Sequence, residues 1–272
     1  MKKLLLFAIL LVLVGCSKDG LFSQLDDVIG IFETGVLDGK FSFGSDKQVC
    51  FSKGNLQYQA SKGVWRFADH QWDYVGYGNE NISNSYSGWI DLFGWGTGNN
   101  PTNISGNNGD YGFYSEWGNN KISNGGNKTY QWRTLSIGEW DYLLRDRNTP
   151  SSIRYACACV NGTNGMVVLP DDWDASYYTL YNVNDYGRFS VNTISSDDWE
   201  KRLEAHGAVF LPAAGARGDD GMTSLKHVGE GGYYWSSTAG GVYTARRVFF
   251  SDDRLHFNDR RRYFGGSVRL VQ

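Results

Sequence analysis

The hydrophobic pattern of this 272-residue chain starts with an unbroken apolar run, residues 4–14, directly behind Lys2 and Lys3. A membrane-spanning helix needs about 20 apolar residues, so this run is too short to cross a bilayer. A short positive start followed by an apolar stretch of this length is typical of a secretory signal peptide. We therefore expect these residues to be an export signal rather than part of the fold.

Beyond residue 40, apolar positions alternate with polar ones or form short continuous runs, which predicts β-strands separated by turns. The expected strands are 48–52, 56–58, 65–67, 154–160, 166–169, 208–211, 233–237, 246–251 and 267–271. Residues 76–130 contain few such runs and form a loop-rich region, in which Trp89, Trp95 and Trp117 are the expected anchors.

Two further segments show a helical pattern. The first, 136–145, carries Ser136 and Glu139 at the spacing of a capping box. The second, 197–207, begins with two aspartates and ends at Gly207, which suits the helix dipole and a glycine C-terminus. Few helices among many short strands predict an α+β fold class rather than a doubly wound sheet.

Composition refines this picture. The chain has 35 Gly and 15% aromatic residues, and disordered segments are poor in aromatics, so we expect long loops pinned by aromatic side chains. The net charge of −3 and the pI of about 5.8 give no reason to expect nucleic acid as a partner.

Three cysteines follow Cys16, an odd number that cannot all pair within the chain. Cys157 and Cys159 lie two residues apart in an expected strand, so they share a face and are poorly placed to bridge each other. We expect both to be small buried residues, and a disulfide of Cys50 stays open.

The end of the apolar run, Leu13-Val14-Gly15-Cys16, resembles the lipobox of bacterial lipoproteins. That resemblance implies cleavage after residue 15, a lipid on Cys16, a tether over 16–40 and a folded domain over 41–272. Several acyl chains give stable membrane anchoring. The following Ser17-Lys18-Asp19 resembles the surface-export signal of Bacteroidales lipoproteins, which implies an outer-membrane protein exposed on the cell surface. An ordinary secretory signal with a chance Cys is the alternative.

The C-terminal segment 236–271 has an unusual composition. It contains no Lys, Glu, Gln, Met or Trp, yet it holds seven of the chain's fifteen Arg. A solvated surface normally accepts Lys as readily as Arg, so physics does not explain the gap. An asparagine codon randomised at its first two adenines can never encode those five missing residues. The gap therefore indicates diversification by a retroelement.

The motifs around this segment strengthen that interpretation. Residues 233–238 and 267–271, with 51–58, 132–135, 169–173 and 207–215 upstream, resemble a large group of Bacteroidales lipoproteins. These have a C-type-lectin-like domain of the formylglycine-generating-enzyme type and resemble the variable proteins of diversity-generating retroelements. The resemblance implies a C-type-lectin-like α+β fold and a surface-displayed protein that binds ligands through a diversified face. It also implies a near-copy of the coding segment beside a reverse transcriptase in the neighbouring DNA.

Alternation within 247–251 predicts that Val248 and Phe250 enter the core, with Leu255 as the next anchor. Exposed Arg and aromatic residues between such anchors are what binding hot spots favour. The predicted ligand-binding residues are Tyr243, Arg247, Phe249, Ser251, Asp252, Asp253, Arg254, His256, Phe257, Asn258, Asp259, Arg260, Arg261, Tyr263 and Phe264. The expected ligand is a protein or a glycan. A solvated hairpin whose Arg residues pair with local Asp is the alternative.

Other chemistry is weakly indicated. Oxidases of the formylglycine-generating type need reactive cysteines late in the chain, and no Cys follows Cys159, so we expect a protein that is not an enzyme. The acidic groups at 171–174 and 219–220 could hold calcium but are more often turn formers. The tripeptide 217–219 matches an integrin motif that recurs by chance. We expect no cofactor and no metal site. A lectin or adhesin subunit of fixed specificity is the alternative function.

Overall fold

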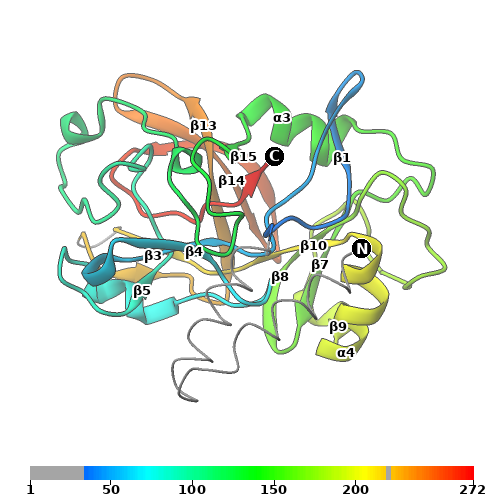
Figure 1. Cartoon of the computed structure of the whole chain (residues 1–272). Coiled ribbons are helices and arrows are strands. Elements are labelled where there is room, and N and C mark those ends of the chain that lie inside the picture. Colours follow the sequence, from blue (N-terminus) through cyan, green and yellow to red (C-terminus); the bar gives the residue numbers. More distant parts are fainter. Residues whose placement is uncertain (1–33, 219–221) are drawn as a thin grey trace, which may run out of the picture.

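The computed structural model describes residues 34–218 and 222–272, so the expected signal peptide, Cys16 and most of the expected tether lie outside the described residues. The described chain is a mixed α+β structure dominated by short strands, as predicted (Figure 1). Within it, no helix has the length and apolar character that crossing a membrane requires.

The strands are β1 (Phe41–Gly44), β2 (Lys47–Val49), β3 (Leu56–Gln59), β4 (Val64–Phe67), β5 (Trp89–Ile90), β6 (Arg133–Thr134), β7 (Tyr155–Val160), β8 (Thr163–Val168), β9 (Thr193–Ile194), β10 (Val209–Pro212), β11 (Ala216–Arg217), β12 (Leu225–Lys226), β13 (Gly231–Ala239), β14 (Thr244–Ser251), β15 (Leu255–Arg261) and β16 (Leu270–Val271). They form three larger sheets, in the orders β10-β8-β7-β9, β13-β14-β15 and β4-β3-β5, and the two-stranded pairs β1-β2, β11-β12 and β16-β6.

Both expected helices are present, and each changes from an α-helical to a π-helical turn. The first is α3 (Ile137–Asp141), continued by Tyr142–Asp146. The second is α4 (Ser196–Asp198), continued by Trp199–Leu203 and the 3-10 turn Glu204–His206. Single 3-10 turns occupy Ala60–Lys62, Gly76–Asn81, Asn108–Tyr111, Trp117–Asn119 and Phe189–Val191.

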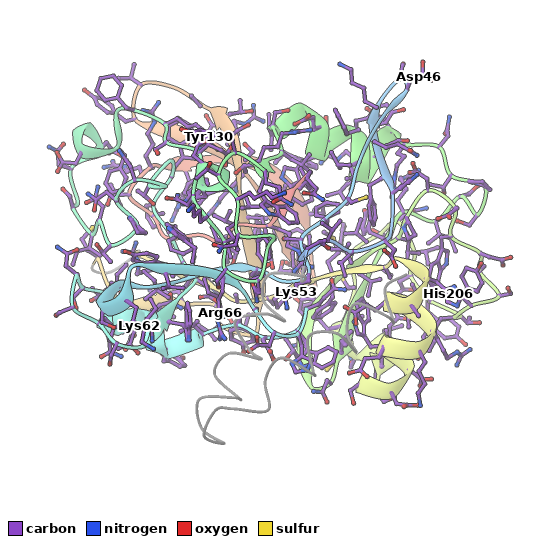
Figure 2. The ribbon with its side chains drawn as sticks, viewed as in Figure 1. Asp46, Lys53, Lys62, Arg66, Tyr130 and His206 are labelled. Carbon is purple, nitrogen blue, oxygen red and sulfur yellow. The ribbon has the colours of Figure 1, made fainter. Side chains whose placement is uncertain are left out.

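The predicted capping box starts α3. Glu139 N donates to Ser136 Oγ (3.3 Å), and Ser136 N donates to Glu139 Oε2 (2.6 Å). The second helical segment ends at Gly207, whose φ of +82° is a left-handed conformation that glycine adopts at little cost. His206 lies at this end (Figure 2), where its ring stacks on Tyr177 at 3.7 Å between centroids.

The four-stranded sheet is buried on both faces, which explains the nearly continuous apolar sequence of β7. Alternate residues of β7 separate into two clusters. Tyr155 and Cys157 pack with Trp140 of α3, while Ala156 and Ala158 pack with Trp199 of the second helical segment. Cys50, Cys157 and Cys159 are all free; Cys157 is buried as predicted, whereas Cys159 is only partly buried.

Tryptophans pin the loops to this core, as their composition predicted. Trp95 and Trp117 are 3% and 0% exposed, although both lie in the loop-rich region. Trp95 Nε1 donates to Ser236 O (2.9 Å), and Trp235 Nε1 donates to Phe93 O (2.8 Å). The loop region is therefore tied directly to β13.

The ends of the described domain meet. Cys50 N donates to Gln272 O and Ser52 N to Leu270 O, both at 2.9 Å. Part of the expected tether belongs to the same unit, because Leu37 N donates to Phe51 O and Asp171 N to Lys40 O, also at 2.9 Å. Residues 35–40 thus pack on the domain, and the boundary expected at residue 41 is too late.

Asp91 is a fully buried carboxylate at the end of β5. Val75 N and Asn79 Nδ2 each donate to it at 2.8 Å, which ties the loop before β5 to this strand. Burial raises the pKa of Asp91 from 3.8 to about 6, and these hydrogen bonds oppose the rise only in part.

We predict that Asp91 makes the fold less stable as pH rises. A pKa raised on folding contributes stability that is fully present below the unfolded pKa and is lost as pH passes the folded value. Between about pH 4 and about pH 7, the stability of Asp91→Asn relative to the wild type should therefore rise by about 2 kcal/mol in the free energy of unfolding. Urea unfolding of both proteins at the two pH values measures this, and an unchanged difference would contradict it.

Candidate functional site

The C-terminal sheet presents two different faces because successive residues of a strand point to opposite sides. On one face, Val248 and Phe250 are 0% and 1% exposed and pack with Tyr234, as the alternation predicted. Leu255 is partly buried against the same cluster. The opposite face carries Tyr233 of β13 and Phe249 of β14, which are cross-strand partners.

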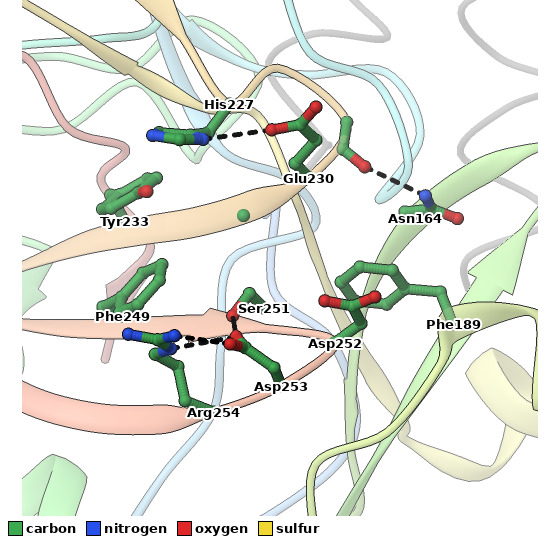
Figure 3. Close-up of a pocket in the computed structure, with 12 residues that line it drawn as sticks. Asn164, Phe189, His227, Glu230, Tyr233, Phe249, Ser251, Asp252, Asp253 and Arg254 are labelled. Atoms are coloured by element: carbon green, nitrogen blue, oxygen red, sulfur yellow. Dashed lines mark hydrogen bonds and ion pairs between the residues drawn. The ribbon is translucent and has the colours of Figure 1, made fainter.

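A pocket of about 590 Å³ opens on this second face, at the end of the sheet where β14 turns into β15 (Figure 3). Its lining comes from β8, from the turn that contains Phe189, from the loop before β13 and from the sheet. The lining residues are Asn164, Phe189, His227, Gly229, Glu230, Gly231, Tyr233, Phe249, Ser251, Asp252, Asp253 and Arg254.

An aromatic stack forms one wall of the pocket. The rings of Tyr233 and Phe249 lie 4.6 Å apart and nearly parallel. The guanidinium of Arg247 lies 4.5 Å from the Tyr233 ring, and Arg247 Nε donates to Asn258 Oδ1 (3.1 Å). The two rings and the guanidinium pack on one another, so the aromatic wall is ordered before any ligand binds.

The polar wall is pre-ordered as well. Asp253 accepts from Arg254 Nε (2.9 Å) and from Ser251 Oγ (2.6 Å), and these donors hold the pKa of Asp253 well below its usual range. On the other side of the pocket, His227 Nδ1 lies 3.0 Å from Glu230 Oε2. Asp252, which also lines the pocket, adds a further carboxylate (Figure 3).

The pocket gathers a third of the predicted ligand-binding residues: Phe249, Ser251, Asp252, Asp253 and Arg254. The others lie elsewhere. Tyr243, Arg260, Arg261, Tyr263 and Phe264 lie near the opposite end of the sheet, at the β13–β14 turn or where β15 ends. Arg247, His256, Phe257, Asn258 and Asp259 lie between the two ends.

Residues 255–261 form a regular strand, which the sequence analysis did not predict. Its alternation divides the predicted residues between two faces, so they cannot present one surface. Phe257 pairs with the buried Val248 and lies under the guanidinium of Arg145 (4.2 Å), on the face that α3 covers. His256 pairs with Phe249 and shares the face of the pocket.

Three predicted ligand-binding residues are not exposed. Phe264 is 6% exposed and packs in the cluster of Trp95 and Trp235, because a large apolar ring gains most by leaving water. Arg247 is 6% exposed because its guanidinium stacks on Tyr233. Ser251 is 9% exposed because its hydroxyl is held by Asp253.

Five side chains that line the pocket were missed, Asn164, Phe189, His227, Glu230 and Tyr233, as were the lining glycines Gly229 and Gly231. Tyr233 belongs to a motif that the sequence analysis noted, but nothing in the local sequence marks the other four. Asn164 Nδ2 donates to Gly229 O (2.9 Å), so a contact across 65 positions shapes this wall. Only the folded chain brings these residues together.

The acidic group considered for calcium has a structural explanation at Asp171. Its carboxylate accepts from Ser42 Oγ (2.6 Å), Gln48 Nε2 (2.8 Å) and Arg147 Nη1 (2.9 Å). It therefore neutralises the fully buried Arg147. Residues 219–220 lie outside the described residues.

A thiol lies behind the pocket. Cys157 Sγ is 3.9 Å from Ser251 O, and burial raises the pKa of Cys157 to about 11. Because the thiolate is the nucleophile and the metal ligand, this cysteine stays in its unreactive form at neutral pH.

In comparisons with known proteins, no family model, no curated protein and no solved structure matches this chain.

We predict that Phe264→Ala destabilises the domain by roughly 3 to 5 kcal/mol, because it empties a buried aromatic site. Tyr243→Ala, which removes an aromatic ring that is 61% exposed, should stay within about 0.5 kcal/mol of the wild type. Urea unfolding measures both, and equal effects would show that Phe264 does not support the core.

Proposed function

We propose that this chain is a lipid-anchored recognition protein with a C-type-lectin-like domain, displayed on the outer surface of a bacterial cell. Its pocket binds a polar ligand, without catalysis, through a segment diversified by a retroelement. The observation that carries the proposal is that the pocket combines framework residues such as His227 and Glu230 with Phe249 and residues 251–254 of the unusual segment.

The framework supports this division of roles. Val248 and Phe250 are buried anchors of strand β14, whereas Asp252, Asp253 and Arg254 follow the strand and are exposed. The chemistry of the pocket can therefore vary while the strand stays fixed. This is what a diversified binding site requires.

The chemistry of the pocket supports binding. Aromatic walls pack against the apolar faces of a ligand, and a few placed polar groups fix its orientation. Arg254 and Asp253 are already ordered by each other, so less conformational entropy is lost when a ligand binds. The unreactive state of Cys157 supports the non-catalytic part of the proposal.

We predict that Phe249→Ala and Asp252→Asn each weaken ligand binding about tenfold or more, because one removes the ring wall and the other a carboxylate. A glycan array with and without calcium identifies a ligand for titration. If no glycan binds, the same variants are compared on a protein array.

Tyr130→Ala is the control, since Tyr130 is 78% exposed and lies outside the pocket lining (Figure 2). It should bind like the wild type, and melting curves verify that all variants fold. Ligands that bind both pocket variants at wild-type strength would refute the pocket.

The anchor has its own test. We predict that cells incorporate labelled palmitate into the wild-type protein and none into Cys16→Ser, because the thiol is the proposed acyl acceptor. Protease digestion of intact cells then reports the display. Labelling of the Cys16→Ser variant, or complete protection from protease, would contradict this part of the proposal.

A further inference from the structure

Three apolar side chains are exposed at the end of the C-terminal sheet opposite the pocket. Val242 and Tyr243, in the turn between β13 and β14, are 77% and 61% exposed, and Phe113, in the loop after Tyr111, is 95% exposed. Figure 1 shows this turn beside the loop that carries Phe113. We call Phe113, Val242 and Tyr243 the tip patch. Single exposed apolar residues are common on protein surfaces. The tip patch differs because a specific set of contacts brings its two segments together.

One buried guanidinium holds both segments. Arg262 is 7% exposed, and its Nη2 donates to Gly241 O (2.9 Å) in the β13–β14 turn. Its Nη1 donates to Tyr111 O (3.2 Å) and Gly112 O (3.4 Å), directly before Phe113. Its Nε donates to Thr244 O (3.2 Å) on the other side of Tyr243. The flat face of the guanidinium lies 4.5 Å from the Trp95 ring.

The turn itself is constrained. Gly240 N donates to Thr244 O (3.0 Å), and a Cβ on Gly240 would lie 2.4 Å from a carboxylate oxygen of Asp259. With the turn closed and both loops fixed to Arg262, the tip patch is presented in a defined geometry. A preordered surface loses little conformational entropy on binding, which favours affinity.

The charge beside the tip patch is positive. Arg261 pairs with Thr244 across the strands and is exposed, and Arg260 precedes it. Nearby Asp259 is neutralised by Arg246 at 2.8 Å. The opposing loop carries one acidic residue, Asp110, whose carboxylate accepts from Ser105 Oγ (2.5 Å). Against this carboxylate stand Arg261 and the guanidinium of Arg262, which donates to backbone carbonyls.

We propose that the tip patch is a docking surface for a partner protein that presents acidic residues around an apolar patch. Phe, Tyr and Arg are the residues enriched at protein interfaces, where Lys is depleted, and the tip combines the first three without Lys. The inference rests on the proposed recognition function but concerns a second surface, at the other end of the sheet from the pocket.

The test selects short random peptides displayed on phage against the folded domain and then titrates the selected peptides. We expect peptides that combine Asp or Glu with apolar residues. Their affinity should fall about tenfold or more in Phe113→Ser and in Tyr243→Ser. Arg261→Glu should weaken them further by reversing the rim charge. Arg262→Lys, which keeps the charge but loses the planar fork, should weaken them while the side chains of the tip patch are unchanged.

Tyr181→Ser is the matched control for Tyr243→Ser, because Tyr181 is also 61% exposed and lies away from the tip. It should leave affinity unchanged, as should the pocket variant Asp252→Asn. If Asp252→Asn loses peptide binding while the tip variants keep it, the proposal of a docking surface at the tip would be overturned, and the proposed pocket would be supported. Selected peptides without acidic residues would overturn the class of partner. If the domain binds anionic phospholipid vesicles and this binding requires the tip patch, the proposed protein partner would be overturned in favour of a membrane surface.

Discussion

Strand β14 is paired along both edges, with β13 on one side and β15 on the other, and the C-terminal segment depends on this pairing. Tyr234, Val248 and Phe257 form one row across the three strands, and Tyr233, Phe249 and His256 form the next. A shift of one residue would move every side chain to the opposite face. The register is fixed because it places Val248 and Phe250 in the core, whereas a shift of one residue would bring the polar Arg247 or Ser251 there instead. The exposed residues can then vary without any change in the path of the strand.

The same arrangement explains why the two ends of the sheet differ. At one end, β8 and the loop before β13 rise beside the sheet and close a pocket, with Asn164 holding that loop. At the other end, the β13–β14 turn and the loop around Phe113 are both hydrogen-bonded to Arg262 and leave three apolar side chains exposed. Each end joins part of the unusual segment to residues far earlier in the chain. Both proposed recognition surfaces are therefore composite, and the segment alone does not make either of them.

Local signals account for what the sequence could predict. Ser136 and Glu139 specify the start of α3 through contacts three residues apart, and the continuous apolar run of β7 reflects burial on both faces. Strand β15 escaped prediction because an edge strand with polar residues on both faces has no clear alternation. The burial of Phe264 was not predicted because it depends on Trp95 and Trp235, which lie far from it in the sequence. Asn164 and Phe189 reach the pocket only through long-range packing, so no local pattern marks them.

The Arg residues of the unusual segment have several different structural roles. Three of these residues, Arg247, Arg262 and Arg269, are buried. Arg262 donates to loop carbonyls, and Arg269 Nη2 donates to Gln71 Oε1 (2.7 Å). Arg247 is buried against Tyr233, while Arg246 and Arg254 pair with aspartates. The guanidinium of Arg260 lies 4.3 Å from the Phe264 ring, which leaves Arg261 as the most plainly solvent-directed member. An Arg count therefore overstates the binding surface. Burial and partners separate the arginines that build the framework from those available to a ligand. They also place the proposed recognition surfaces at the two ends of the sheet, around Asp252 and around Tyr243.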